Sequence, residues 1–311
     1  MNKIIIISGP TASGKTATSI QIAKKFQAEV VNFDSLLFYR ELNIGTAKPT
    51  DQEQEGVPHH FINTHSIYNP INAADYLKIA EPKINEIHAK GSPVILVGGS
   101  GFYLQALLNG MFESTTTPQD IINKSDLLYS SSGIEPFRDI LREHDTLAYD
   151  QYHPNDHYRI RRAVEHFWTT NTPFSLKRTE MKDRLTNSPV KRNQWDLLHI
   201  HLDIPKEEHF EIIKQRTSHM LSHGLLDEVK NLLNSGATGN EKPMLSIGYK
   251  ESVAYLRGEY QTIEDLSERI SINTRRLAKS QRTWFKKSIK NHYNPIEEFD
   301  KIQNICNEFL R

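Results

Sequence analysis

The sequence predicts an α/β fold: a parallel sheet core of the P-loop NTPase type, flanked by helices, with a mostly helical inserted domain. A glycine-rich loop at 9–16 joins a strand-like run to a helix-like run, and strand-like and helix-like segments alternate before residue 111. No strand candidate then appears until residue 197. Such alternation is typical of parallel sheets. We therefore expect 1–111 and 190–311 to form the core, with C-terminal basic helices, and 112–189 to be a helical insertion.

Each expected element depends on its own residue pattern. Short apolar runs, several of them β-branched, predict buried strands at 3–8, 28–33, 93–97 and 197–203. Apolar residues at helical spacing predict helices at 15–26, 73–88 and 263–287. Ligands of such sheets bind at the carboxyl ends of the strands, so the segments that follow the strands are candidates for the site.

The long helix expected at 263–287 carries two stripes. Its apolar residues step by three, four and seven positions and predict a core-facing stripe of Ile263, Leu266, Ile270, Leu277 and Trp284. Its basic residues form a separate stripe of Arg275, Lys279, Arg282 and Lys286. Between residues 269 and 290 there is no acid and there are eight basic residues, which include Arg269, Arg276, Lys287 and Lys290. Such a segment indicates nucleic-acid binding; a solvated helix face is the alternative.

Composition narrows the class of protein. The 311 residues hold 38 basic and 38 acidic side chains, so net charge favours no particular partner. A single cysteine, Cys306, excludes an internal disulfide framework and a cysteine-based zinc site. The longest purely aliphatic run, 4–7, is far shorter than the ~18 residues of a membrane span, and no secretory signal pattern precedes it. We expect a cytoplasmic protein with no membrane partner.

The segment GPTASGKT at 9–16 matches the phosphate-binding pattern G-x-x-x-x-G-K-[ST], and it comprises Gly9, Pro10, Thr11, Ala12, Ser13, Gly14, Lys15 and Thr16. Glycines let backbone N–H groups point into one concavity, and the start of a helix adds positive potential. Lys15 would neutralise the outer phosphate and the Thr16 hydroxyl would ligate Mg²⁺. The motif predicts a diphosphate ligand, which need not be ATP.

Polar residues follow two further strands. Asp34 and Ser35 come after the second strand, where a carboxylate could hold Mg²⁺ through water or accept a proton; a helix N-cap is the alternative. The segment 98–101, Gly-Gly-Ser-Gly, follows the third strand and permits close backbone approach, or is simply a turn. Arg159 and Arg162 would share a helix face and contact phosphate, or belong to a surface helix capped by Asp156.

Two histidine pairs suggest a metal only weakly. They are His59 with His60, and His199 with His201, which would share a face of a strand. No cysteine or carboxylate cluster accompanies them in the sequence, so we expect no zinc site.

Taken together, these motifs resemble the bacterial tRNA dimethylallyltransferases. The matching segments are GPTASGKT at 9–16, Asp34-Ser35, Tyr39-Arg40, IGTAKP at 44–49, VPHH at 57–60, VGGSGFY at 97–103, HPND at 153–156 with Arg159 and Arg162, IGY at 247–249 and TRRLAKSQRTW at 274–284. The segments follow the family order over nearly the whole chain. IGTAKP and the R-x-L-A-K-x-Q-x-x-W run are the most specific of them.

The resemblance implies transfer of a dimethylallyl group from dimethylallyl diphosphate to N6 of the adenosine 3′ of the anticodon. It implies that Asp34 accepts the proton of the amine and that Lys15, Thr16 with Mg²⁺ and Arg216 stabilise the leaving diphosphate. It also implies contact with the tRNA anticodon stem-loop through Asp34, Ser35, Leu36, Leu37, Ser100, Tyr158, Arg159, Ile160, Arg161, Arg162, Leu245, Ser246, Ile247, Gly248, Tyr249, Lys250, Thr274, Arg275, Arg276, Leu277, Ala278, Lys279, Ser280 and Gln281. We expect a monomer.

The chain departs from the family pattern at a few positions. Ser100 stands where threonine is frequent, Ser280 where a basic residue is frequent, and Ile212 where an arginine is frequent. The alternatives are a P-loop small-molecule kinase, an adenylate isopentenyltransferase acting on free AMP, and a non-catalytic nucleic-acid-binding ATPase. The first two leave the basic segment unexplained.

Overall fold

The structure is a computed structural model that describes residues 2–111, 117–176, 188–286 and 292–311. Its chain forms two compact units, Met1–Leu108 with Asn193–Arg311, and Asn109–Arg192. The sequence pattern predicts an insertion at 112–189, within a few residues of the second unit. Among the residues described, none of the helices combines the length and apolar character that crossing a bilayer requires.

The first unit contains a six-stranded sheet in the order β3-β2-β4-β1-β5-β6. All neighbouring strands are parallel, as the sequence predicts. The strands are β1 (Lys3–Ser8), β2 (Glu29–Asn32), β3 (His59–His60), β4 (Val94–Gly98), β5 (Asp196–Leu202) and β6 (His292–Tyr293). Ser8 at the end of β1 pairs with Gly98 of β4 and with His201 of β5. The carboxyl ends of the three central strands therefore meet at one edge.

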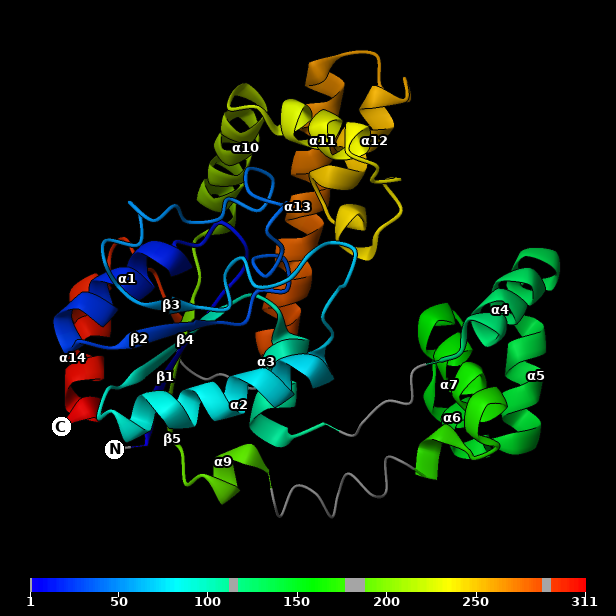
Figure 1. Cartoon of the computed structure of the whole chain (residues 1–311), viewed down its shortest axis with the longest axis horizontal. Coiled ribbons are helices and arrows are strands. Elements are labelled where there is room, and N and C mark those ends of the chain that lie inside the picture. Colours follow the sequence, from blue (N-terminus) through cyan, green and yellow to red (C-terminus); the bar gives the residue numbers. More distant parts are fainter. Residues whose placement is uncertain (1, 112–116, 177–187, 287–291) are drawn as a thin grey trace. The chain divides into compact units, whose positions relative to one another are not determined.

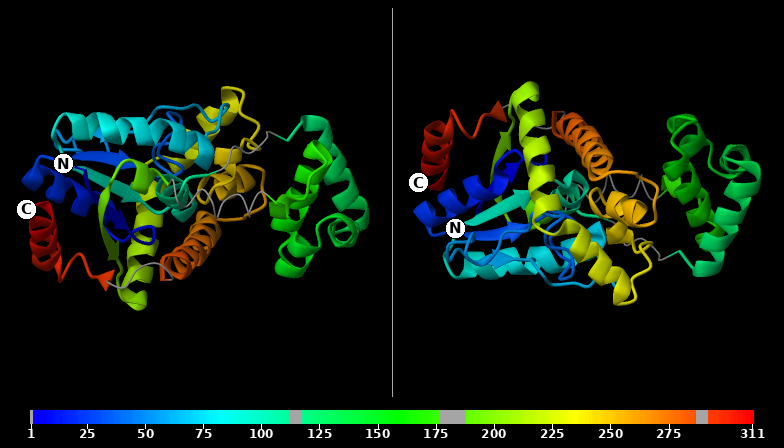
Figure 2. Two further views of the ribbon diagram at one scale, coloured as in Figure 1. Left: turned by 90° about the horizontal axis from the view of Figure 1, so that it is seen from below. Right: turned by 90° about the horizontal axis from the view of Figure 1, so that it is seen from above.

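Alternating residues of the central strands bury the two faces of the sheet. Ile5 and Ile7 pack in one core cluster with residues of α1 (Lys15–Phe26) and α14 (Phe299–Leu310). Their neighbours in β1 point to the opposite face because strand side chains alternate. Helix α2 (Ala73–Ala89) lies along that opposite face, whereas α1 and α14 lie together on the first (Figures 1 and 2).

The chain after β5 is helical, and one of its helices corrects the predicted core stripe. The helices are α10 (Lys206–Ser222), α11 (Leu225–Asn234), the 3-10 helix η2 (Lys242–Leu245), α12 (Tyr249–Leu256) and α13 (Ile263–Lys286). In α13 the buried residues are Leu266, Ile270, Ser271, Ala278 and Phe285. Ile263, Leu277 and Trp284 are 46%, 39% and 43% exposed, so the predicted stripe was wrong at those three positions. The face that packs is rotated by one residue over the last turns.

The second unit is a helical bundle with its own core. It contains α4 (Gln119–Ser132), α5 (Glu135–His144), α6 (Thr146–Gln151), α7 (His157–Thr170) and α9 (Pro189–Arg192), and α3 (Gly101–Asn109) ends where it begins. Phe137 and Leu141 of α5 pack against Ile160 and Val164 of α7. The i, i+4 spacing of each pair places its two side chains on one helix face.

Candidate active site

The loop between β1 and α1 has the shape of an anion cradle. Gly14 starts α1 from a left-handed conformation (φ +81°), and Ala12 is also left-handed (φ +62°). For a residue with a side chain this conformation costs about 1–2 kcal/mol, so contacts from outside must hold the loop. The Ser13 hydroxyl is buried and has no hydrogen-bond partner among the described residues. A buried hydroxyl without a partner suits a loop that wraps a phosphate oxygen.

Three predicted catalytic residues come together at this edge. Lys15 at the start of α1 donates from Nζ to the Pro10 carbonyl at 2.6 Å. Burial lowers the pKa of Lys15 to about 8, against a raising effect of Asp34 and together with a lowering effect of Arg216. Burial likewise lowers the pKa of Arg216, and the Asp34 carboxylate raises it. One carboxylate and two cations thus interact beside the loop.

Asp34 begins a turn, not a helix. Its Oδ1 accepts a hydrogen bond from the Leu36 N–H at 3.1 Å, and its own N–H donates to Asn32 Oδ1 at 2.8 Å. The carboxylate is half-buried. These two bonds fix the backbone and one oxygen, and among the described residues no hydrogen bond involves Oδ2. The geometry therefore leaves that oxygen available as a proton acceptor.

The glycines after β4 let the end of α13 approach the sheet. A Cβ added at Gly99 would lie 2.5 Å from Gln281 Nε2, and one at Gly101 would lie 2.1 Å from Trp284 Nε1. Ser100 between them donates from Oγ to Ser35 Oγ at 3.1 Å and accepts from the Ser35 N–H at 3.0 Å. The segment is thus more than a turn, because it joins the residues after β2 and β4 to α13.

A loop at 43–48 closes beside Arg216. Glu228 of α11 accepts from the N–H groups of Asn43 (3.0 Å), Ile44 (2.9 Å) and Gly45 (3.4 Å). Arg216 of α10 donates to the Thr46 carbonyl at 3.2 Å. The sequence alone does not single out Glu228, because an acidic residue in an ordinary helix carries no local signal of long-range contacts with loop amides.

The residues present fit a magnesium ion held mainly by its substrate. Thr16 is exposed at the first turn of α1, and its hydroxyl has no hydrogen-bond partner among the described residues. The described residues contain no group of three or more His, Cys, Asp or Glu side chains suited to a metal. Mg²⁺ commonly takes one or two protein oxygens together with phosphate oxygens and water. Thr16 is the expected protein ligand.

Only some of the basic residues of α13 are exposed and without an acidic partner among the described residues. Arg276, Lys279 and Lys286 are exposed and have no acidic partner among the described residues. Arg275 is half-buried with its guanidinium over the Phe210 ring, and the Arg282 side chain, 17% exposed, forms an ion pair with Asp203. Of the four predicted stripe residues, Lys279 and Lys286 are therefore exposed, whereas Arg275 and Arg282 make contacts within the protein. Lys287 and Lys290 lie outside the described residues.

The remaining residues that the resemblance implies for tRNA contact differ in exposure. The exposed ones are Tyr158, Arg159, Leu245, Lys250, Arg276, Leu277, Lys279 and Ser280. The half-buried ones are Asp34, Ser35, Leu36, Leu37, Ser100, Arg161, Arg162, Ser246, Ile247, Thr274, Arg275 and Gln281. The side chains of Ile160, Tyr249 and Ala278 are buried and pack inside the protein, and Gly248 is buried with them. Direct contact remains a prediction for the residues whose side chains reach solvent.

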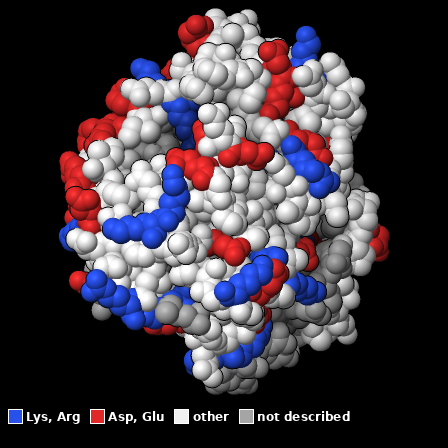
Figure 3. Space-filling model, turned by 60° about the vertical axis from the view of Figure 1, so that its left-hand side comes forward, with Lys and Arg blue, Asp and Glu red and all other residues white. Residues whose placement is uncertain are grey.

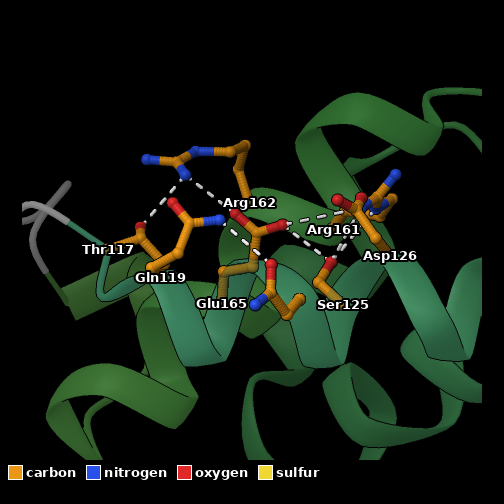
Figure 4. Close-up of polar contacts among 8 residues, drawn as sticks. Thr117, Gln119, Ser125, Asp126, Arg161, Arg162 and Glu165 are labelled. Atoms are coloured by element: carbon orange, nitrogen blue, oxygen red, sulfur yellow. Dashed lines mark hydrogen bonds and ion pairs between the residues drawn. The ribbon is translucent and has the colours of Figure 1, made fainter.

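On α7, acidic residues hold the arginines in place. Arg162 pairs with the buried Glu165 at 2.8 Å, and Arg161 contacts Asp126 and Ser125 (Figure 4). Arg159 is exposed and pairs at 2.9 Å with Asp156, which also caps the helix by accepting the Arg159 N–H. The capped surface helix is thus the observed local structure. On the face drawn in Figure 3, basic and acidic side chains are likewise interspersed.

The side chains of both histidine pairs contact other protein groups. Ser8 Oγ lies 2.8 Å from His199 Nε2 and 2.9 Å from His201 Nδ1. Burial lowers the pKa of both histidines to about 4, so they are neutral at ordinary pH. His60 lies 2.7 Å from the Glu29 carboxylate.

Comparison with known proteins supplies the family context. The family model described as IPP transferase matches residues 37–288. A tRNA dimethylallyltransferase 2 of Geotalea uraniireducens is 38% identical over 308 residues, which cover 99% of this chain and 96% of that protein. A tRNA dimethylallyltransferase of Geobacter sulfurreducens is 37% identical, covering 99% of this chain and 97% of the other.

A solved structure shares the same architecture. The full-length tRNA isopentenylpyrophosphate transferase of Bacillus halodurans superposes with a TM-score of 0.70 at 31% identity, covering 100% of this chain and 97% of the other. The similarity therefore extends over the whole chain and includes both compact units.

Proposed function

The chain belongs to the IPP transferase family and is a prenyl-transferring enzyme; on that premise we propose that it moves a dimethylallyl group from dimethylallyl diphosphate to N6 of the adenosine 3′ of the anticodon in tRNA. The products are N6-isopentenyladenosine and diphosphate. The observation that carries this proposal is the cluster that Asp34 and Arg216 form with Lys15 of the loop 9–16. An amine acceptor needs a base and a diphosphate leaving group needs cations, and this edge holds both.

The proposed reaction is a substitution at the first carbon of the dimethylallyl group. The N6 lone pair forms the new C–N bond while the C–O bond to diphosphate breaks, and diphosphate leaves with the bonding electrons. The proton of N6 moves to the Asp34 carboxylate. General-base catalysis of this kind contributes about 10²–10⁴-fold in rate.

The leaving group would lie in the loop 9–16. Backbone N–H groups, the Lys15 ammonium and the Arg216 guanidinium stabilise the negative charge that grows on the diphosphate oxygens. Lys15 has three donors and uses one on the Pro10 carbonyl, so two remain for phosphate oxygens. Mg²⁺ on Thr16, when bound, would neutralise further charge on the diphosphate.

The acceptor must reach this edge as an unstacked base. Bases that undergo chemistry are flipped out of the stack, and RNA loops present bases that can be splayed in this way. The exposed cations of α13 would hold the anticodon stem-loop by its phosphates, with Tyr158 and Arg159 of the helical unit as a second contact. We infer that the enzyme acts as a monomer in the cytoplasm, where its tRNA substrate resides.

Mass spectrometry of tRNA tests the proposal directly. Incubation of the chain with tRNA, dimethylallyl diphosphate and Mg²⁺ should add one C₅H₈ unit, and nuclease digestion should place it on the adenosine 3′ of the anticodon. A stem-loop with inosine at that position lacks the exocyclic amine and is the matched control. Asp34→Asn keeps the acceptor for the Leu36 N–H and should abolish most of the gain.

Other results would identify the alternatives. Modification of free AMP with unmodified tRNA would indicate an adenylate isopentenyltransferase. Phosphate transfer from ATP to a small molecule would indicate a kinase. Hydrolysis of ATP that tRNA stimulates, without a modified base, would indicate a nucleic-acid-dependent ATPase.

A further inference from the structure

Thr11, the third residue of the loop 9–16, is held on both sides of its peptide backbone. Its N–H donates to Gln281 Oε1 at 2.8 Å, and Gln281 Nε2 donates to the Gly99 carbonyl at 3.0 Å. The Thr11 carbonyl lies 2.8 Å from His209 Nε2. The next residue, Ala12, has the unfavourable left-handed backbone described above. These outside contacts therefore meet the loop where its conformation needs support.

The contact to the carbonyl depends on a second residue of α13. Arg282, adjacent to Gln281, directs Nη2 to His209 Nδ1 at 2.7 Å. A guanidinium only donates, so Nδ1 must be the bare nitrogen of the ring. The neutral ring then carries its proton on Nε2, which donates to the Thr11 carbonyl. Arg282 thus selects the tautomer that can support the loop.

Arg282 is in turn held in place by protein contacts. Its Nε forms an ion pair with Asp203 Oδ1 at 2.7 Å, and Nη2 also donates to the Ile204 carbonyl at 3.1 Å. His209 is fully buried in α10. A doubly protonated His209 would direct an N–H at the Arg282 guanidinium. Burial lowers the pKa of His209, the bond to the Thr11 carbonyl opposes this to a smaller extent, and Arg282 lowers the pKa further, consistent with the neutral ring.

We propose that His209 and Arg282 are a positioning pair that shapes the diphosphate-binding loop and ties it to α13. Asp203 orients Arg282, Arg282 fixes the His209 tautomer, and His209 holds the Thr11 carbonyl away from the ligand so that the loop amides stay aimed at it. That the loop binds diphosphate rests on the proposed function. The pair would shape the loop in the same way for any acceptor of the transferred group. Neither residue touches the substrate.

The test uses the full chain and two readouts. The first is binding of inorganic diphosphate in the presence of Mg²⁺, measured by calorimetry, and the second is kcat and KM for dimethylallyl diphosphate at saturating tRNA. His209→Leu replaces the imidazole ring by an apolar side chain of similar size and should weaken diphosphate binding by about five- to tenfold, as expected for removal of one buried hydrogen bond. The donor KM should rise by a similar factor, and tRNA affinity should not change.

A double-mutant cycle tests whether the two residues act as one path. Arg282→Leu should weaken diphosphate binding by a factor close to that of His209→Leu, and the double variant should be no worse than either single variant. If the effects of the two substitutions on diphosphate affinity multiply, the proposal that the residues act as a pair is wrong. His209→Gln, whose amide nitrogen takes the place of Nε2, should restore part of the diphosphate affinity.

His88 provides a matched control. It is a buried histidine on α2 that contacts a backbone carbonyl, that of Lys3, at the opposite end of β1. His88→Leu should lower the melting temperature without changing diphosphate affinity. If the His209 and Arg282 variants also lose only stability, with diphosphate binding intact, the positioning role is wrong.

The two proposals fail in different ways. Wild-type chain that binds diphosphate but modifies no tRNA would contradict the proposed function and leave the positioning pair to be judged by the diphosphate measurements. Wild-type chain that does not bind diphosphate would overturn the positioning pair, because its loop would then have no such ligand to be shaped for.

Discussion

Positive charge occurs in two different settings in the first unit. At the carboxyl edge of the sheet, Lys15 and Arg216 are largely withdrawn from water and interact with Asp34 and backbone carbonyls. On the outer side of α13, Arg276, Lys279 and Lys286 are exposed and have no acidic partner among the described residues. Charge count alone would not separate the two groups, but burial does.

The buried and the exposed groups of charges should therefore control different observables. Buried charges interact at short range and are poorly screened, so they should affect donor binding and the chemical step with little dependence on salt. Exposed charges displace counterions from RNA, so they should affect tRNA affinity with a strong dependence on salt. Substitutions in each group can test this separation, beginning with the largest expected effect.

Replacing Asp34 should give the largest loss. Asp34→Asn keeps the hydrogen bond to the Leu36 N–H but cannot accept a proton, so the single-turnover rate should fall by about 10²–10⁴-fold. The affinity for tRNA should stay within about twofold at every salt concentration, because the variant keeps every exposed cation. Rapid-quench measurements at saturating substrates give the rate. A near-normal rate would reduce Asp34 to a residue that caps a turn.

Raising the pH should weaken donor binding through Lys15. Burial lowers the pKa of Lys15 to about 8 in the free enzyme, and only the protonated amine attracts diphosphate. Donor affinity should therefore be constant below about pH 7.5. Above pH 8 it should fall by about tenfold per pH unit, because the protonated fraction of Lys15 falls by that factor. Calorimetric titration of Mg²⁺–diphosphate between pH 6.5 and 9.5 measures this.

Lys48 is the control for that experiment. Burial also lowers its pKa to about 8, and it lies in the loop at 43–48. Lys48→Arg stays protonated throughout the range, so a pH dependence that persists in this variant belongs to Lys15. If the dependence disappears, Lys48 is responsible and the assignment to Lys15 fails.

The sequence was sufficient to predict the sheet core and the edge that carries the loop 9–16, because those features have local signals. A β-branched run followed by glycines and a lysine predicts a strand, a loop and a helix, and residues after the strands of a parallel sheet share one edge. The two-residue strands β3 and β6 were not predicted. Each of these strands is too short to show an alternating apolar and polar pattern, and only its pairing with a longer neighbour defines it.

The local sequence pattern could not predict which basic side chains are bound by other residues of the protein. Arg282 is bound by Asp203 and His209, which lie 79 and 73 positions away in the chain. Helical spacing predicted that Leu277 and Trp284 share a face, but it could not show that the face one residue further packs into the core. Contacts between residues far apart in the sequence decide both outcomes.

Neutralising the exposed cations of α13 should lower tRNA affinity and leave the chemistry intact. We expect Arg276→Gln, Lys279→Gln and Lys286→Gln each to cost about a kcal/mol at low salt, or about fivefold in affinity. The slope of log K against log salt should fall by roughly 0.7–0.9 for each phosphate-binding cation that is removed. Titrations of a labelled anticodon stem-loop at several salt concentrations measure both quantities.

The matched control for α13 is an exposed lysine at the other end of the sheet. Lys25 lies in the last turn of α1, away from the loop 9–16, and Lys25→Gln should change neither affinity nor salt slope. A triple variant of Arg276, Lys279 and Lys286 that keeps the wild-type slope would contradict a docking role for this surface.

The smallest expected effect concerns the helical unit, where acidic residues already neutralise the arginines. Asp156 pairs with the exposed Arg159 and also caps α7. Asp156→Asn should keep the cap, because asparagine caps helices as well as aspartate does, and it should release Arg159 from its ion pair.

Exposed ion pairs are worth at most about 1 kcal/mol, so tRNA affinity should rise by about two- to threefold at low salt and by nothing at high salt. Arg159→Ala in the same background should remove the gain, and the melting temperature should change by no more than about 4 °C, because the lost ion pair is exposed. Unchanged tRNA affinity in Asp156→Asn at low salt would mean that Arg159 does not contact the phosphates of the tRNA.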